Sequence, residues 1–281
     1  MYNLLFMKTF ICGCARNCDT YLDAVFENIA KIIPLFEDYK IVIAYDKSND
    51  FTLRKLCYYK TIYNVEILIN PNPITNIRTQ NICIARNAIL KYIRKCNEDE
   101  QFDTFIMMDM DDVCSTPIIT ENLQKYLTRN DWDALSFNRS DYYDIWALSI
   151  QPYTYSCWHV PNGYAAVDKI KKFMKDTLDE CDDDNLVECL SAFNGFAIYR
   201  MEAFRNVVYE WNINKNPMPK SWLIESAKAM GQPIIRRPND DDCEHRYFHM
   251  QAIRENGARI RISPLTLFRS NQRFPFDPAT I

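Results

Sequence analysis

The sequence predicts an α/β fold in which helices flank a mostly parallel central sheet. Short apolar runs alternate with helical patterns from residue 8 to residue 138, and polar residues follow several of these runs. Alternating strands and helices are typical of parallel sheets, which bind ligands at the carboxyl ends of their strands. The pattern loosens after residue 140. We therefore expect one domain over 1–281, with a regular nucleotide-binding half over about 1–140 and an irregular substrate-binding half over about 141–281.

The first half is expected to contain strands and helices in alternation. Strands are predicted at residues 8–14, 40–45, 65–70, 104–109 and 133–138. Helices are predicted between them at about 19–35, 50–59, 79–97 and 118–129. In the third helix Ile82, Ala85, Ile89 and Ile93 recur at three- and four-residue spacing. A helix with one buried face requires this spacing.

The second half is less regular. A segment over 140–164 is dense in aromatic residues, and a helix is predicted at 166–178 before an acidic loop at 179–185. A strand is predicted at 191–200, followed by a polar connection with prolines over 209–220. The chain then shows an acidic turn, a helix that ends at Gly257, and a last strand, because glycine commonly follows the final turn of a helix.

Composition excludes several classes of protein. The net charge is −4 with no long basic block, so nucleic acid is not expected as a partner. No apolar run reaches the roughly 18 residues that a membrane-spanning helix needs. The 11 cysteines are scattered and odd in number, and we find no secretory leader. We expect free thiols and a reducing, cytoplasmic setting.

A pair of carboxylates follows the most apolar predicted strand. Asp109 and Asp111 end the run over 104–109, and alternation along a strand places both side chains on one face. Neighbouring carboxylates repel each other unless a cation compensates them, and Mg²⁺ or Mn²⁺ binds such oxygens together with phosphate and water. An acidic surface loop is the alternative. The place at the carboxyl end of a central strand favours a metal site.

Two arginines lie on the third predicted helix. Arg78 begins this helix and Arg86 follows two turns later. A cation in the first turn opposes the helix dipole, so Arg78 stands against the local preference. A bound diphosphate would explain it. A surface salt bridge is the alternative for either arginine.

Polar residues follow the first two strands at the same predicted edge of the sheet. Ala15 and Arg16 come after the first strand, and Asp46 and Ser48 after the second. A nucleotide base and ribose would lie here. Helix capping is the alternative, and it fits Asp19 well.

An Asn-Gly pair, Asn194 and Gly195, interrupts the strand predicted at 191–200. Glycine inside a strand is unfavourable and often marks close approach of a ligand or of another backbone. A β-bulge is the alternative.

Carboxylates and histidines gather near the end of the chain. His245 and His249 are one helical turn apart in the segment 239–249. This spacing permits zinc binding, but the pattern is not HExxH and only one glutamate stands nearby. A better hypothesis is that Glu244 acts as a general base and that His245 completes the coordination shell of a metal ion.

Taken together, these residues resemble a metal-dependent glycosyltransferase of the GT-A fold. The resemblance covers most of the chain in order, through the segments "CGCARN", "IVIAYDKSNDFT", "RTQNICIARNAIL", "MDMDDV", "YYDIWALS", "SAFNGFAIYR" and "DCEHRYFHMQAIRENGARIRISP". Three positions depart from the family pattern, with Asp46 for Glu, Ser149 for Arg and Asn194 for Gly. The resembling subgroup includes fungal capsular mannosyltransferases and transferases of large DNA viruses. The fit extends to a chlorovirus-like β-xylosyltransferase that acts on fucose.

The resemblance implies a nucleotide-sugar donor, UDP-linked and with xylose as its sugar, and a glycan or glycoprotein acceptor such as fucose. Mn²⁺ or Mg²⁺ would bridge Asp111 and the diphosphate, with Asp109 near the ribose or the metal. In an inverting reaction a carboxylate takes the proton of the acceptor hydroxyl. That base is expected at Glu244, with Asp242 as the alternative, and His245 is left open as a third metal ligand.

The resemblance places the remaining donor and acceptor contacts. Donor-binding residues are expected at Ala15, Arg16, Asp46, Arg78, Arg86, Asp109, Asn194 and Gly195. Acceptor-binding residues are expected at Asp144, Trp146, Tyr155 and Trp158. For the aromatic members the alternative is a hydrophobic lid or a subunit contact in a homodimer.

Two other functions remain open at this point. A nucleotidyltransferase that makes nucleotide sugars would share the sheet and the acidic site, but it usually opens with a glycine-rich phosphate loop, and the first loop here has only Gly13. A catalytically inactive glycan-binding protein of the same fold is the other alternative, favoured by the departures at Ser149 and Asn194.

Overall fold

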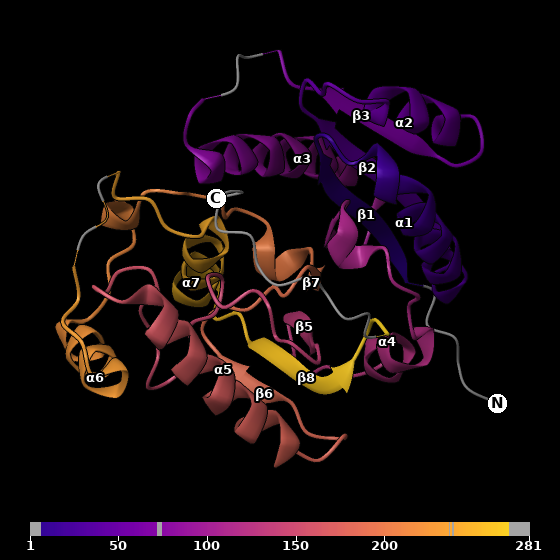
Figure 1. Ribbon diagram of the computed structural model, residues 1–281. Helices are drawn as coiled ribbons and strands as arrows, with labels where there is room; N and C mark the ends of the chain where they lie inside the picture. Colours follow the sequence, from indigo (N-terminus) through magenta and orange to yellow (C-terminus); the bar gives the residue numbers. More distant parts are fainter. Residues whose placement is uncertain (1–6, 72–74, 236, 238, 270–281) are drawn as a thin grey trace.

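The chain folds around one eight-stranded sheet with helices on both faces (Figure 1). The computed structural model describes residues 7–71, 75–235, 237 and 239–269. The strand order is β3-β2-β1-β4-β7-β5-β8-β6. The first-half predictions are confirmed, with the bounds β1 Lys8–Ala15, α1 Asp19–Ile32, β2 Asp38–Tyr45, α2 Thr52–Lys60, β3 Val65–Ile69, α3 Arg78–Glu100, β4 Thr104–Asp109, α4 Thr120–Leu127 and β5 Ala134–Asn138.

The second half follows the predictions in part. Its elements are α5 Gly163–Asp179, β6 Val187–Cys189, β7 Phe196–Arg200, α6 Lys220–Met230, α7 Glu244–Asn256 and β8 Ile260–Thr266. Three differences stand out. The strand predicted at 191–200 begins only at Phe196, β6 was not predicted, and the polar connection leads into the unpredicted helix α6.

Alternation along β1 divides the apolar side chains between two cores. Phe10 and Cys12 are buried with residues of α3, α5 and α7, whereas Ile11 is buried with residues of α1, α2 and α4. Successive side chains of a strand point to opposite faces, so an unbroken apolar strand is stable only when both faces are covered. This arrangement explains why the strands of the first half read as continuous apolar runs.

The sheet is parallel except where β7 and β6 enter it. The parallel pairs are β1 with β2, β1 with β4, β2 with β3, and β5 with β8. Strand β7 is antiparallel to both neighbours, β4 and β5, with Met108 opposite Phe196. The amino end of β7 therefore lies at the same edge as the carboxyl ends of β4 and β5. This edge gathers the predicted site residues.

Candidate active site

The edge of the sheet brings the end of β4 against the turn that precedes β7. The backbone N–H of Asp109 donates to the carbonyl of Gly195 at 2.9 Å. Two residues on, Asp111 caps a short 3₁₀ helix over Asp112–Cys114, accepting the N–H of Val113 at 3.1 Å. Asp109 and Asp111 therefore both lie at the carboxyl edge, as the sequence predicts.

The Asn-Gly pair is part of a turn, which corrects the expectation that it interrupts a strand. Asn194 and Gly195 have φ of 56° and 87°, both left-handed. A Cβ on Gly195 would lie 2.2 Å from Val113 Cγ1 and 3.5 Å from Asp109 Oδ2. Asparagine tolerates a left-handed backbone better than most residues, which explains how Asn194 adopts this conformation. Because Gly195 has no side chain, the backbone of the turn can lie close to Asp109.

Arg86 of α3 joins several carboxylates of the site. Its guanidinium forms an ion pair with Glu244 and also contacts His245 Nε2. A second, longer ion pair of 3.5 Å reaches Asp109. The group stacks 4.8 Å from the ring of Phe193, and the Arg86 and Glu244 side chains are almost completely buried. A protein cation thus compensates Glu244, expected from the sequence as the general base, and also reaches Asp109, one of the carboxylates expected to hold the metal.

Tyr143 is a site residue that the sequence reasoning missed. Its hydroxyl donates to Asp109 Oδ2 at 2.7 Å. Burial, together with the charges of Asp109 and Asp144, raises the pKa of the phenol, so it stays a donor. The segment "YYD" provided a signal, because it follows directly on the loop after β5.

Asp144 lies beside this tyrosine in a loop that hydrogen bonds hold in place. Its N–H donates to Asn194 Oδ1 at 3.3 Å, and its own Oδ1 accepts the N–H of Ala147 at 3.2 Å. Asn194 is fixed in turn, since its Nδ2 donates to the carbonyl of Phe137 at 3.0 Å. Burial, and next the charge of Asp109, raises the pKa of Asp144 to about 6.

The two loops predicted to bind the nucleotide are held together. The N–H of Asp46 donates to the carbonyl of Ala15 at 3.1 Å, and Asn70 Nδ2 donates to the Asp46 carboxylate at 2.7 Å. Arg16 and Arg78 are exposed at the end of β1 and the start of α3. The structure thus places Arg78 where a solvent-borne anion can reach it.

The second candidate base, Asp242, is engaged by a buried arginine. Its Oδ2 lies 2.9 Å from Arg246 Nε. The same guanidinium donates to the carbonyls of Trp146, Leu148 and Thr154. Arg246 therefore fastens the loop over 146–154 to the start of α7.

The predicted acceptor aromatics each contact a different neighbouring side chain. Arg237 lies 5.3 Å from the Trp146 ring. The ring of Tyr155 meets His159 edge to face at 5.3 Å, and Trp158 meets Tyr164 in the same way at 5.5 Å. Of these, Trp146 belongs to the loop that also carries Tyr143 and Asp144.

The metal ligands predicted from the sequence, Asp109, Asp111 and His245, do not all come together at one site. Within the described ranges no group of three or more His, Cys, Asp or Glu side chains is arranged to hold an ion. His245 stacks on Phe193 and contacts Arg86, and burial lowers its pKa. His249 bonds to Ser191 and Tyr199 in the core. The hard oxygens of Asp109 and Asp111 fit an ion that keeps phosphate and water ligands.

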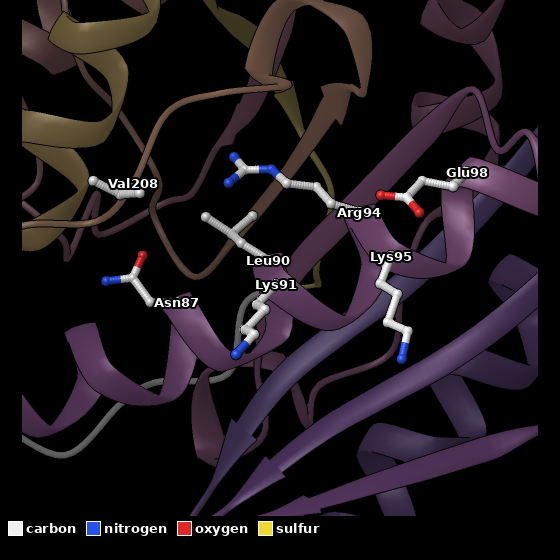
Figure 2. A pocket seen from close by; sticks show the side chains of 7 residues that line it. All are labelled: Asn87, Leu90, Lys91, Arg94, Lys95, Glu98 and Val208. Carbon is white, nitrogen blue, oxygen red and sulfur yellow. The ribbon is translucent and has the colours of Figure 1, made fainter.

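A separate hollow of about 400 Å³ lies along α3, away from these carboxylates (Figure 2). It is lined by Asn87, Leu90, Lys91, Arg94, Lys95, Glu98 and Val208. Asn87 bonds to the backbone of Tyr209, and Arg94 donates to the carbonyls of Phe204 and Val207. These polar groups hold the loop over 204–209 against α3.

None of the helices in the described part of the chain has both the length and the apolar character to cross a bilayer. All 11 cysteines are free, as expected.

Comparison with known proteins finds similarity in structure. No protein-family model matches the chain, and no curated protein matches it in sequence. The Staphylococcus aureus TarS 1-349 structure in complex with UDP-GlcNAc matches with a TM-score of 0.52 and 14% identity, covering 96% of this chain and 60% of that one. The S. aureus TarS structure matches with a TM-score of 0.50 and 14% identity, covering 93% and 36%.

The chain therefore spans less than two thirds of the length of each of these two structures. A third similar structure, Mycobacterium tuberculosis glucosyl-3-phosphoglycerate synthase in complex with Mn²⁺, uridine diphosphate and phosphoglyceric acid, has a TM-score of 0.48 at 10% identity, covering 95% of this chain and 72% of that one. The likeness to the TarS structures establishes the fold, which is the GT-A fold expected from the sequence.

Proposed function

We propose that the protein is a glycosyltransferase that moves a sugar from a nucleotide-sugar donor to a hydroxyl of a glycan. One observation carries the proposal: the carboxyl edge of a GT-A sheet presents Asp109 and Asp111 together, next to the loops after β1 and β2 and the start of α3. In sheets of this kind ligands bind at this edge.

The donor is proposed to be a UDP-sugar. Its base and ribose would lie against Ala15, Arg16 and Asp46, and its diphosphate near Arg78. The matching TarS 1-349 structure is a complex with UDP-GlcNAc, which supports a UDP-linked donor here. The resemblance of the sequence supports xylose as the sugar and fucose as the acceptor.

A divalent ion, Mn²⁺ or Mg²⁺, fits the proposed site. Asp111 and Asp109 would hold it, and when bound it would neutralise the charge that develops on the leaving diphosphate. Tyr143 holds the Asp109 carboxylate in one orientation by its 2.7 Å hydrogen bond. Arg86 reaches the other oxygen of Asp109 and limits the charge of the site before any ligand binds.

An inverting displacement needs a carboxylate that accepts the proton of the acceptor hydroxyl. Three side chains of the site are candidates for this base: Glu244, Asp242 and Asp144. The acceptor itself would lie over the loop that carries Trp146, with Tyr155 and Trp158 farther along the same aromatic segment.

A thermal-shift screen tests the proposed function. UDP-xylose, UDP-GlcNAc, UDP-glucose and GDP-mannose are each added with and without Mn²⁺. A ligand at 100 times its dissociation constant stabilises the fold by about 2.7 kcal/mol, so the bound donor raises the melting temperature by several degrees. We expect one UDP-sugar to do so only with Mn²⁺. No shift with any nucleotide sugar contradicts the proposal.

Stabilisation by a nucleoside triphosphate and a sugar 1-phosphate, but not by any nucleotide sugar, would instead indicate a nucleotidyltransferase. The variant Asp111→Asn is the control, since it should abolish the shift that depends on Mn²⁺.

A further inference from the structure

The three candidate bases differ in what already holds them. We propose that Asp144 is the general base of the transfer reaction and that Glu244 and Asp242 are held by arginines for structural purposes. This inference rests on the proposed function and assigns one step of it.

Glu244 is bound by a cation before any substrate arrives. Its Oε1 forms the ion pair with Arg86, and only 3% of the residue is exposed. Removing one partner from a buried ion pair leaves the other charge uncompensated, which is strongly destabilising. A carboxylate that must stay paired to keep the fold is poorly suited to take up a proton in each turnover.

Asp242 has a comparable constraint. It pairs with Arg246, and the exposed fractions of the two residues are 3% and 0%. Arg246 needs this charge because its guanidinium is otherwise surrounded by carbonyl groups. A general base has to reach within hydrogen-bond distance of the hydroxyl that it deprotonates. The buried place of Asp242 keeps its carboxylate from this contact.

Asp144 does not have these constraints. It has no ion-pair partner in the part of the chain that the structure describes, and it is only half-buried. Its Oδ1 is fixed by the N–H of Ala147, and Oδ2 makes no hydrogen bond within the described residues. The carboxylate is thus oriented by one oxygen while the other is left for a hydroxyl.

The position of Asp144 along the chain places it beside the donor site. The residue before it, Tyr143, bonds to Asp109, and its own N–H bonds to Asn194 of the turn that touches Asp109. The following turn carries Trp146, an aromatic surface suited to the ring of a sugar. Burial and the charge of Asp109 raise the pKa of Asp144 to about 6, nearer to the neutral range in which a base works best.

The proposed step transfers one proton and exchanges one bond. The acceptor oxygen forms a bond to the anomeric carbon of the donor sugar. The bond from that carbon to the diphosphate oxygen breaks, and its electron pair leaves with the nucleoside diphosphate. The acceptor proton moves to Asp144 Oδ2 and later returns to water. Atoms and charge therefore balance without an oxidant or a further reactant.

The test compares Asp144→Asn with Asp141→Asn. Asparagine at 144 keeps an oxygen for the Ala147 N–H, so the loop should persist. Asp141 lies in the same loop and pairs with Arg139 at 3.8 Å, which makes it a matched carboxylate outside the site. UDP-xylose and UDP-GlcNAc serve as donors with Mn²⁺, and methyl α-fucoside or water serves as acceptor. Calorimetry gives the donor affinity, and release of UDP gives kcat.

We expect Asp144→Asn to lower kcat by roughly 100-fold or more, since a positioned base contributes about 10²- to 10⁴-fold, and to leave donor affinity within about threefold. Asp141→Asn should change neither. If Asp144→Asn keeps more than about a tenth of the wild-type kcat, Asp144 is rejected as the base while the proposed function stands. If the wild-type protein binds none of the nucleotide sugars, UDP-glucose and GDP-mannose included, the proposed function and this role fail together.

Discussion

Arg86 and Glu244 form an ion pair that connects the middle of α3 to the first residue of α7. The two residues are 5% and 3% exposed, and Arg86 also reaches Asp109. Burial alone would lower the pKa of Arg86, but Glu244 together with Tyr209, Cys14 and Asp109 outweighs burial, and the pKa is raised. The pair therefore remains charged, and it makes two helices that are far apart in the sequence dependent on each other.

Replacing Arg86 by methionine should destabilise the protein strongly. The change leaves Glu244 buried without its cation, which costs about 3–5 kcal/mol of unfolding free energy. Urea denaturation measures the difference. The double variant with Glu244→Leu should recover most of it, because both charges are then gone. Arg205→Ala, at an exposed ion pair with Glu202, is the control and should cost less than about 1 kcal/mol.

Replacing Asp111 by asparagine should remove binding of UDP that depends on Mn²⁺. A neutral amide is a weaker ligand for a hard cation than a carboxylate. Calorimetry with UDP should show a loss of at least tenfold in affinity in the presence of Mn²⁺, which corresponds to about 1.4 kcal/mol. Asp112→Asn is the matched control, since Asp112 is the exposed neighbouring carboxylate. Equal affinities of both variants and the wild type would contradict the proposed metal site.

Replacing Tyr143 by phenylalanine should weaken the same binding without unfolding the protein. The hydroxyl donates to the Asp109 carboxylate, and a hydrogen bond to a charged group contributes about 1.5–3 kcal/mol. We expect roughly tenfold weaker binding of UDP with Mn²⁺. Tyr142→Phe is the control, because the Tyr142 hydroxyl is buried and has no hydrogen-bond partner among the described residues. Similar effects of both changes would show that the hydroxyl of Tyr143 does not position Asp109.

Replacing Gly195 by alanine should both strain the turn and displace Val113. The left-handed backbone costs an alanine about 1–2 kcal/mol, and the added Cβ would lie 2.2 Å from Val113 Cγ1. Gly257 has a similar φ of 66°, but nothing lies within 4 Å of its Cβ position. We expect Gly195→Ala to lose about 1–3 kcal/mol more unfolding free energy than Gly257→Ala, as overpacked sites do. Equal losses would indicate that Val113 moves aside at no cost.

Stability should depend on the protonation of Asp144. Its pKa in the folded protein is about 6, above the value near 3.9 of an unfolded chain. Between these values the folded state binds more protons, so its contribution to the unfolding free energy falls as pH rises from about 4 to 6. The slope is at most about 1.4 kcal/mol per pH unit. Without added metal, Asp144→Asn should gain stability relative to the wild type over this range. Parallel stability curves would show that Asp144 titrates normally.

The elements of the first half were predictable because each strand is buried on both faces and each helix has a clear apolar face. Helix α6 was missed since its exposed Ile224 and half-buried Trp222 and Leu223 leave no clean apolar stripe. Strand β6 was missed because it has three residues, too few to show alternation. The early start predicted for β7 had another cause. Ala192 and Phe193 are buried and apolar like strand residues, but the left-handed turn at Asn194 and Gly195 separates them from the strand.

The residue types of the candidate site and their places along the chain could be predicted from the sequence. The contacts between their side chains could not. The sequence could place Asp109, Arg86 and Glu244 at the same edge. Which cation faces which carboxylate depends on the packing of α3 against α7, and these helices begin 166 residues apart. Tyr143 could not be assigned to the site either. It lies in a loop, and its hydrogen bond to Asp109 depends on how that loop folds against the end of β4.

The order of strands has a consequence for how the chain can be divided. Strand β5 ends at Asn138, yet both of its neighbours, β7 and β8, come from residues after 195. A fragment that stopped near residue 140 would hold β5 with no strand on either side and would leave β4 with one open edge. Exposed edges of this kind promote aggregation. The two halves differ in regularity and in their proposed ligands, but they share one sheet, and this sheet is complete only after the last strand, β8, has been synthesised.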